Sequence, residues 1–258
     1  MRGRCRLMVE RLSPSRGTIF VALAACVLTW FIVAPHLPRV GLWPAIVIVS
    51  VFVMPATLAL VLIALPVWSK RWVVAAAVAC ALLALVFSLL DWGLPANFAK
   101  LWAAVFAGSA FLKLFEQLSW VVLVAFVIPA VDAISVWHGP TKAITAHHFE
   151  VYTAVAIAFL VPGGGAAYLG PPDVLFYALF LAAAARWNLR VFWTWFAMTF
   201  MYSFTVVFAN ALDVGGLPAL PFLSFGFLAA NADLLLARRR SAGSSSSPSY
   251  SGDDPAPS

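Results

Sequence analysis

Two aspartates, Asp132 and Asp173, are the residues of this chain best suited to do chemistry. Each is embedded in apolar sequence, the first in IPAVDAISVW and the second in PPDVLFYALF. A carboxylate within a membrane span costs at least about 2.5–3.5 kcal/mol on insertion scales, so an acid retained there is by default a functional candidate. Two carboxyls that meet at low dielectric cannot both ionise, and the pair shares one proton. Such a pair can activate water and polarise a peptide carbonyl, as in an aspartic protease.

The same pair also suits a different class of protein. A transporter can use buried carboxylates as a proton relay or as a coupled proton site. The two aspartates alone favour protease and transporter about equally. The other acids near apolar runs are explained more simply as charges at span ends or beside basic residues, and they are Asp91, Glu116, Asp213 and Asp233.

Composition places these acids in a membrane. The chain has 258 residues, is 64% hydrophobic and 10% charged, and has a mean hydropathy of +0.97. Soluble domains are about 45–50% apolar, whereas a spanning helix needs about 20 apolar residues. We therefore predict an all-α fold, a polytopic transmembrane helical bundle of about eight spans. They are Thr18–Ala34, Val40–Val67, Trp72–Leu90, Ala96–Leu114, Leu118–Trp137, Tyr168–Ala185, Val191–Asn210 and Leu217–Leu236.

The basic residues predict the orientation of the chain. Cytoplasmic flanks of short loops are enriched in Lys and Arg, and with the N-terminus inside, the outer side carries only Arg39 and Lys142. The net charge of +6 is then a topology signal and indicates no nucleic-acid partner. We expect a multi-pass protein of a bacterial cell membrane with both termini in the cytoplasm.

This topology places the two aspartates at the same depth. Asp132 lies five residues before the outer end of its span at Trp137, and Asp173 lies five residues after Tyr168. At 1.5 Å per residue, each is roughly 7–8 Å below the outer boundary. Consecutive spans are usually neighbours, so we expect the two carboxyls to face each other.

A proline-rich stretch, GLPALPF, opens the last span at the same level. Pro218 and Pro221 have no N–H to donate, so the backbone there should be partly unwound and keep groups that an extended substrate could use. Two further prolines, Pro171 and Pro172, predict that a helix starts just before Asp173. Asp173 should then be the ionised base in a first helical turn and Asp132 the proton holder.

Three motifs, VDAISV, LGPPDVLFY and PALP, stand in this order with one further span between the last two. Together they resemble the presenilin and signal peptide peptidase family of intramembrane aspartyl proteases. That family carries Tyr-Asp in one span, Gly-x-Gly-Asp in the next and Pro-Ala-Leu at the start of the last. The resemblance covers about 118–236. It implies that Asp132 and Asp173 are the catalytic pair, with these residues in substrate-positioning motifs: Val131, Gly170, Pro172, Pro218, Ala219 and Leu220.

The resemblance also implies the partners of the site. The substrates would be transmembrane segments of other proteins or signal-peptide remnants, cleaved without a cofactor or metal. Two departures bear on activity, because Val131 replaces the family's aromatic residue and Pro172 replaces its second glycine. A catalytically inactive relative that only binds membrane helices is therefore a third hypothesis. The family commonly has nine spans, and Val151–Pro162 is either the ninth or, from its alternation, a strand or re-entrant segment near the substrate path.

The chain divides into four parts by these criteria. They are a basic cytoplasmic N-terminus (1–17), N-terminal transmembrane helices (18–117), a catalytic transmembrane half (118–237) and a disordered C-terminal tail (238–258). The tail is rich in Ser, Pro and Gly and cannot bury apolar surface. A cluster comprising His138, His147, His148 and Glu150 is more simply an interfacial group than a metal site.

Overall fold

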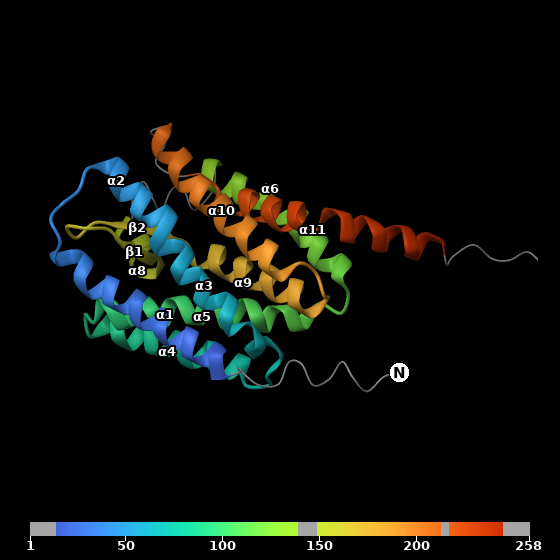
Figure 1. The fold of residues 1–258 in the computed structure, drawn as a ribbon, viewed down its shortest axis with the longest axis horizontal. Helices are drawn as coiled ribbons and strands as arrows, with labels where there is room; N and C mark the ends of the chain where they lie inside the picture. Colours follow the sequence, from blue (N-terminus) through green and yellow to red (C-terminus); the bar gives the residue numbers. More distant parts are fainter. Residues whose placement is uncertain (1–13, 139–148, 213–216, 245–258) are drawn as a thin grey trace, which may run out of the picture.

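The computed structural model describes residues 14–138, 149–212 and 217–244, and Figure 1 shows their arrangement. Helices account for most of this part of the chain, together with one two-stranded sheet. The longer helices are α1 (Pro14–Val33), α3 (Met54–Ala64), α4 (Val73–Leu89), α5 (Gly93–Phe111), α6 (Leu118–His138), α9 (Pro171–Arg186), α10 (Val191–Ala211) and α11 (Ala219–Ser244). The short helices are α2 (Leu42–Val47) and α8 (Phe149–Val155), and the strands are β1 (Ile157–Leu160) and β2 (Ala166–Leu169).

Five helical segments are long and apolar enough to cross a membrane, which indicates a membrane protein. They are Arg16–His36, Leu42–Ala64, Leu118–Ser135, Val191–Ala211 and Ala219–Arg238, and each coincides with a predicted span. The other three predicted spans are also helices but fall short of this criterion. α4 has 17 residues, α9 has 16, and α5 carries Lys100. The coarse prediction of a helical membrane protein is confirmed, while the number of eight spans stays a prediction.

The second predicted span contains a π-helical turn whose cause is local. The segment Ile48–Val53 is π-helical and lies between α2 and α3, just before Pro55. In a π-helix each carbonyl bonds to the amide five residues on, as the Met54 amide does with the Val49 carbonyl. The next carbonyl, that of Ser50, would need an amide that Pro55 lacks. The Ser203 hydroxyl of α10 donates to it instead, at 2.6 Å, and this contact joins the π-helical turn to α10.

Helix α9 is the centre of the bundle. It contacts α5, α10 and α11, and the side chains from Tyr177 to Ala184 are all buried. The small residues of its ALFLAAAA stretch allow this close packing. On α5, Gly108 lies against the backbone of Leu175, where a Cβ atom would collide with the Leu175 carbonyl. The predicted N-terminal and catalytic parts of the chain are thus packed together through α5 and α9.

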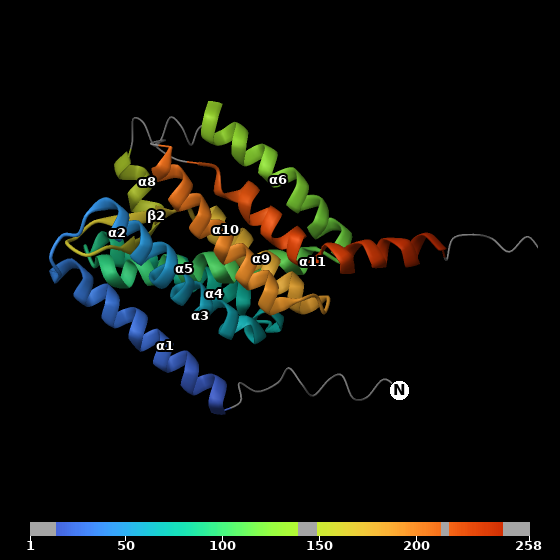
Figure 2. The same ribbon diagram turned by 45° about the horizontal axis from the view of Figure 1, so that its top comes forward.

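Helix α6 lies on the outside of the bundle, packed mainly along α11 (Figure 2). α4 packs on α5, and α1 packs on α3. These outer helices leave many large apolar side chains exposed, for example Leu82, Phe126 and Ile134. Exposure of such residues is expected where lipid, and not water, is the solvent.

The segment before α9 is a β-hairpin. β1 and β2 pair antiparallel, with Ile157 opposite Leu169 and Leu160 opposite Ala166. The sequence predicted a strand or a ninth span within Val151–Pro162, and the structure has α8 up to Val155 followed by a strand. The predicted span start at Tyr168 was wrong, since Tyr168 and Leu169 belong to β2 and the helix begins at Pro171.

The far end of the last helix differs from the prediction. α11 continues to Ser244, so residues 238–244 are helical, although we expected them in a disordered tail. Near this end, the Arg190 guanidinium and the Asp233 carboxylate form an ion pair at 2.6 Å, although the sequence had associated Asp233 with the basic residues Arg238–Arg240. The remainder of the predicted tail lies outside the described residues.

Candidate active site

Asp173 lies in the first turn of α9, where the sequence predicted a helix start. Gly170 is the N-cap, and Pro171 and Pro172 occupy the first helical positions, where their missing N–H groups leave no bond unmade. The Gly170 amide donates to Asp173 Oδ2 at 3.1 Å, and the Asp173 amide donates to the Gly170 carbonyl at 3.1 Å. This reciprocal capping pair fixes the carboxyl relative to the hairpin. A Cβ at residue 170 would approach Asp173 Oδ2 to 3.1 Å, so glycine leaves the carboxyl room.

Asp132 lies in α6 and contacts the start of α11. The Leu220 amide donates to Asp132 Oδ2 at 3.1 Å. This amide belongs to the first turn of α11, whose N–H groups have no partner within the helix. The predicted Pro-Ala-Leu motif is therefore joined to the predicted catalytic aspartate by a direct hydrogen bond, across 88 positions of sequence.

The two aspartates, which we call the dyad, lie near each other and are both half-buried. The helices that carry them, α6 and α9, contact each other. Each carboxyl accepts a hydrogen bond from the N-terminal turn of a helix or its cap, Asp173 at α9 and Asp132 at α11. The second of these bonds was not foreseen, and it makes the surroundings of the two carboxyls more alike than we expected. That the pair shares one proton, and that Asp132 holds it, both stay predictions.

Two buried tyrosines support the dyad from α9 and α10. The Tyr202 hydroxyl donates to the main-chain carbonyl of Asp173 at 2.6 Å, and the Tyr177 hydroxyl lies 2.8 Å from the Thr199 hydroxyl. The two tyrosine rings stack with their centroids 5.8 Å apart. The sequence analysis gave neither tyrosine a role. The sequence did contain one signal: Thr199 and Tyr202 lie three positions apart in an apolar helix. This spacing places both side chains on one face of α10.

A third tyrosine approaches the dyad from α8, which is not among the five helical segments long and apolar enough to cross a membrane. Burial and the nearby Asp173 carboxyl raise the pKa of Tyr152 to about 12. Its phenol group is therefore protonated throughout the neutral range. Val131, where the resembled family has an aromatic residue, is 56% exposed on the outside of α6. Aromatic groups near this dyad come from Tyr152 of α8 and Tyr202 of α10, and not from position 131.

The other predicted site residues differ in how deeply they are buried. Pro218 is buried and Ala219 half-buried at the start of α11, next to Leu220. Pro172 is exposed, so its side chain takes no part in the dyad. Of the predicted histidine and glutamate cluster, His147 and His148 lie outside the described residues, and Glu150 is exposed. Within the described ranges no three His, Cys, Asp or Glu residues are grouped as metal ligands would be.

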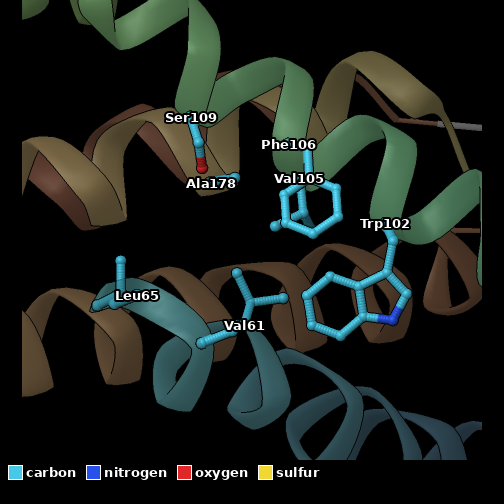
Figure 3. Close-up of a pocket in the computed structure, with 8 residues that line it drawn as sticks. Val61, Leu65, Trp102, Val105, Phe106, Ser109 and Ala178 are labelled. Carbon is cyan, nitrogen blue, oxygen red and sulfur yellow. The ribbon is translucent and has the colours of Figure 1, made fainter. Parts of the chain in front are cut away.

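A separate pocket lies between α3, α5 and α9 (Figure 3). Its lining includes Val61, Trp102, Phe106 and Ala178. The Ser109 hydroxyl and the Trp102 indole are its polar groups, and no acid, base or cysteine lines it. This lining therefore offers no group for acid–base chemistry.

No protein-family model matches this chain, and no curated protein matches it.

Proposed function

We propose that this protein is an intramembrane aspartyl protease that hydrolyses peptide bonds in transmembrane segments. The observation that carries the proposal is the hydrogen bond from the Leu220 amide to Asp132, beside a second aspartate at the cap of α9. Three segments distant in sequence contribute two carboxyls and a helix start to one place. The same three segments carry the resemblance to presenilin and signal peptide peptidase.

The chemistry requires one carboxylate and one protonated carboxyl. The carboxylate takes a proton from water as the water oxygen bonds to the scissile carbonyl carbon, and the protonated carboxyl gives its proton to the carbonyl oxygen. The resulting diol collapses as the newly protonated carboxyl gives its proton to the amide nitrogen, the other carboxylate takes a proton from a diol hydroxyl, and the C–N bond breaks. The products are an amine and a carboxylic acid, and no covalent enzyme intermediate forms.

The substrate class follows from the surroundings of the dyad. Asp132 lies on α6, which packs along α11 and otherwise faces outward (Figure 2). A helix that approaches from the lipid can reach this side without crossing the bundle. Its own carbonyls are in helical hydrogen bonds, so it must unwind before a carboxyl can reach one. Transmembrane segments of other membrane proteins and signal-peptide remnants have this form.

The departures from the family motifs do not alter the dyad. Val131 is 56% exposed, and Pro172 fits the first turn of α9, where a proline is well tolerated. This favours an active enzyme over a relative that only binds helices. A proton-coupled transporter would use the same carboxyls. The following experiment distinguishes this function from that of a protease.

The test uses the purified full chain in liposomes with a single-span reporter protein. We expect cleavage of the reporter, inhibition by a transition-state isostere of the aspartyl class, and loss of cleavage in Asp132→Ala and in Asp173→Ala. The double variant should lose no more than either single variant, because a dyad acts as a unit. Near-normal turnover in either single variant would refute the dyad. Proton-coupled uptake without cleavage would identify a transporter.

A further inference from the structure

We propose that Asn97 is a positioning residue for the dyad: its carboxamide stands in for a neighbouring strand along the outer edge of β1 and fixes the hairpin that leads into Asp173. This inference rests on the proposed proteolytic function. Asn97 lies near the start of α5, a helix with no residue in the motifs that carry the resemblance.

Asn97 makes a two-way contact with the β1 backbone. Its Nδ2 donates to the Ala158 carbonyl at 2.9 Å, and the Ala158 amide donates to its Oδ1 at 2.7 Å. A residue in an added antiparallel strand exchanges the same two bonds with its partner. Asn97 is only 9% exposed, so water offers little substitute for these bonds. Both the nitrogen and the oxygen of the carboxamide are therefore hydrogen-bonded to the backbone of one residue of β1, Ala158.

A second side chain continues this contact along the strand. In an antiparallel pair, alternate residues bond to the partner strand and the residues between them face the other edge. The Val161 amide bonds to the Gly165 carbonyl on the β2 side at 2.9 Å, so Ala158 and Leu160 face outward. The Trp30 indole N–H of α1 donates to the Leu160 carbonyl at 3.0 Å. Asn97 and Trp30 thus occupy the β1 edge, where another strand could otherwise pair.

The turn of the hairpin is attached to the same N-terminal helices. The Gly163 amide donates to the Ala34 carbonyl at 3.1 Å. Gly163 has a φ of +85° and lies directly against Arg39, where a Cβ would collide, so both conformation and space require glycine. The hairpin is therefore attached at its edge by Asn97 and Trp30 and at its turn by Ala34.

The hairpin position determines where Asp173 lies. β2 ends at Leu169, and the next residue, Gly170, donates its amide to the Asp173 carboxyl. A displacement of β1 along α5 would carry β2 and Gly170 with it. Asp173 would then move relative to Asp132, which is bonded to α11 through Leu220. Small displacements of reacting groups lower turnover strongly, because catalysis requires the attack geometry. An open β1 edge could also accept a substrate strand at a distance from the dyad.

The experiment compares three variants of the full chain in the liposome cleavage assay. Asn97→Leu keeps the size and removes the donor and the acceptor. We expect its kcat to fall about tenfold with a smaller change in KM, and its products to spread to neighbouring peptide bonds when their termini are read by mass spectrometry. Asn97→Gln keeps both groups and should recover part of the rate and the original cleavage position. Trp30→Phe loses one bond of the same edge and should show the same change to a smaller extent.

Asn231→Leu is the matched control. Asn231 is also buried, at 0% exposed, and accepts from the Arg190 amide at 3.0 Å while donating to Thr194 Oγ1 at 2.8 Å between α10 and α11. Its loss should lower the unfolding temperature without moving the cleavage position. Wild-type cleavage positions and kcat in Asn97→Leu, measured well below its unfolding temperature, would overturn the inference, as would equal product patterns in the two Leu variants. If Asn97→Leu does not fold, the product pattern of Trp30→Phe tests the inference, and a wild-type pattern in that variant would overturn it. Absence of cleavage by the wild type would instead refute the proteolytic function itself.

Discussion

Replacing Tyr202 by Phe tests whether the main chain at Asp173 must be held in place for turnover. The substitution removes one hydroxyl and leaves the ring that stacks on Tyr177. The lost bond is the 2.6 Å contact to the Asp173 carbonyl. In a regular helix that carbonyl also accepts from the amide four residues on, so it keeps one partner. The net loss should be at the lower end of the range for a hydrogen bond, about 0.5–1 kcal/mol.

The effect on rate follows from this figure. If the whole loss falls on the transition state, kcat decreases about two- to fivefold, since about 1.4 kcal/mol corresponds to a factor of ten. KM should change less, because Tyr202 is buried behind α9 and does not face an approaching helix. The measurement is cleavage of the single-span reporter in liposomes over a range of reporter densities, with thermal unfolding in detergent recorded in parallel.

Thr199→Val provides the control for Tyr202→Phe. It removes the 2.8 Å bond between Thr199 and Tyr177 in the same buried layer and leaves the Asp173 carbonyl bonded to Tyr202. Both variants should lose similar stability, and only Tyr202→Phe should lose turnover. Equal loss of kcat in the two variants would show that Tyr202 acts through packing alone. Unchanged kcat in Tyr202→Phe would show that the Asp173 main chain needs no such support.

Three further predictions concern other parts of the bundle. The double variant Pro218→Ala, Pro221→Ala should allow α11 to extend toward its N-terminus and satisfy its own amides, so reporter cleavage should fall while an isostere inhibitor still binds. Gly108→Val should destabilise the protein by about 1–3 kcal/mol, because its side chain would collide with the Leu175 backbone on α9. Tyr152 has a pKa of about 12 in the fold against an ordinary value of 10.0, so its phenol stabilises the fold below about pH 10 and loses that contribution as pH rises toward 12. Tyr152→Phe should remove this alkaline loss, seen in thermal unfolding against pH, and leave the shape of the pH–rate profile between about pH 5 and 9 unchanged.

Each of these three has an outcome that would contradict it. Normal cleavage in the double proline variant would make the motif a simple helix start. Wild-type thermal stability in Gly108→Val would mean that α5 and α9 can separate without cost, and Gly93→Val, at a glycine with no atom near its Cβ position, is the control. An alkaline shift of the rate profile below pH 9 in Tyr152→Phe would give its phenol a titrating role, contrary to the pKa of about 12.

The sequence by itself determined the properties that arise within one segment. Apolar runs such as Leu118–Trp137 and Val191–Asn210 predicted helices that the structure contains. This works because a bilayer requires each backbone group to bond within its own helix. The helix start at Pro171 was also predictable, since the fixed φ of proline and its missing N–H act on the first turn alone. Asp132 and Asp173 stood out for the same reason, because the cost of a charge depends on the apolar sequence around it.

Only the tertiary structure decided which segments meet. The strand AAYL, Ala166–Leu169, carries no signal that separates it from the start of a span, because its conformation depends on pairing with Ile157–Leu160. The same holds for Asn97. In the sequence it is an ordinary polar residue of a predicted span, and only the structure shows that its carboxamide bonds to the Ala158 backbone. The Leu220–Asp132 and Tyr202–Asp173 bonds join residues 88 and 29 positions apart. Such contacts depend on how the helices pack against each other, and hydrophobic periodicity within a single helix does not contain that information.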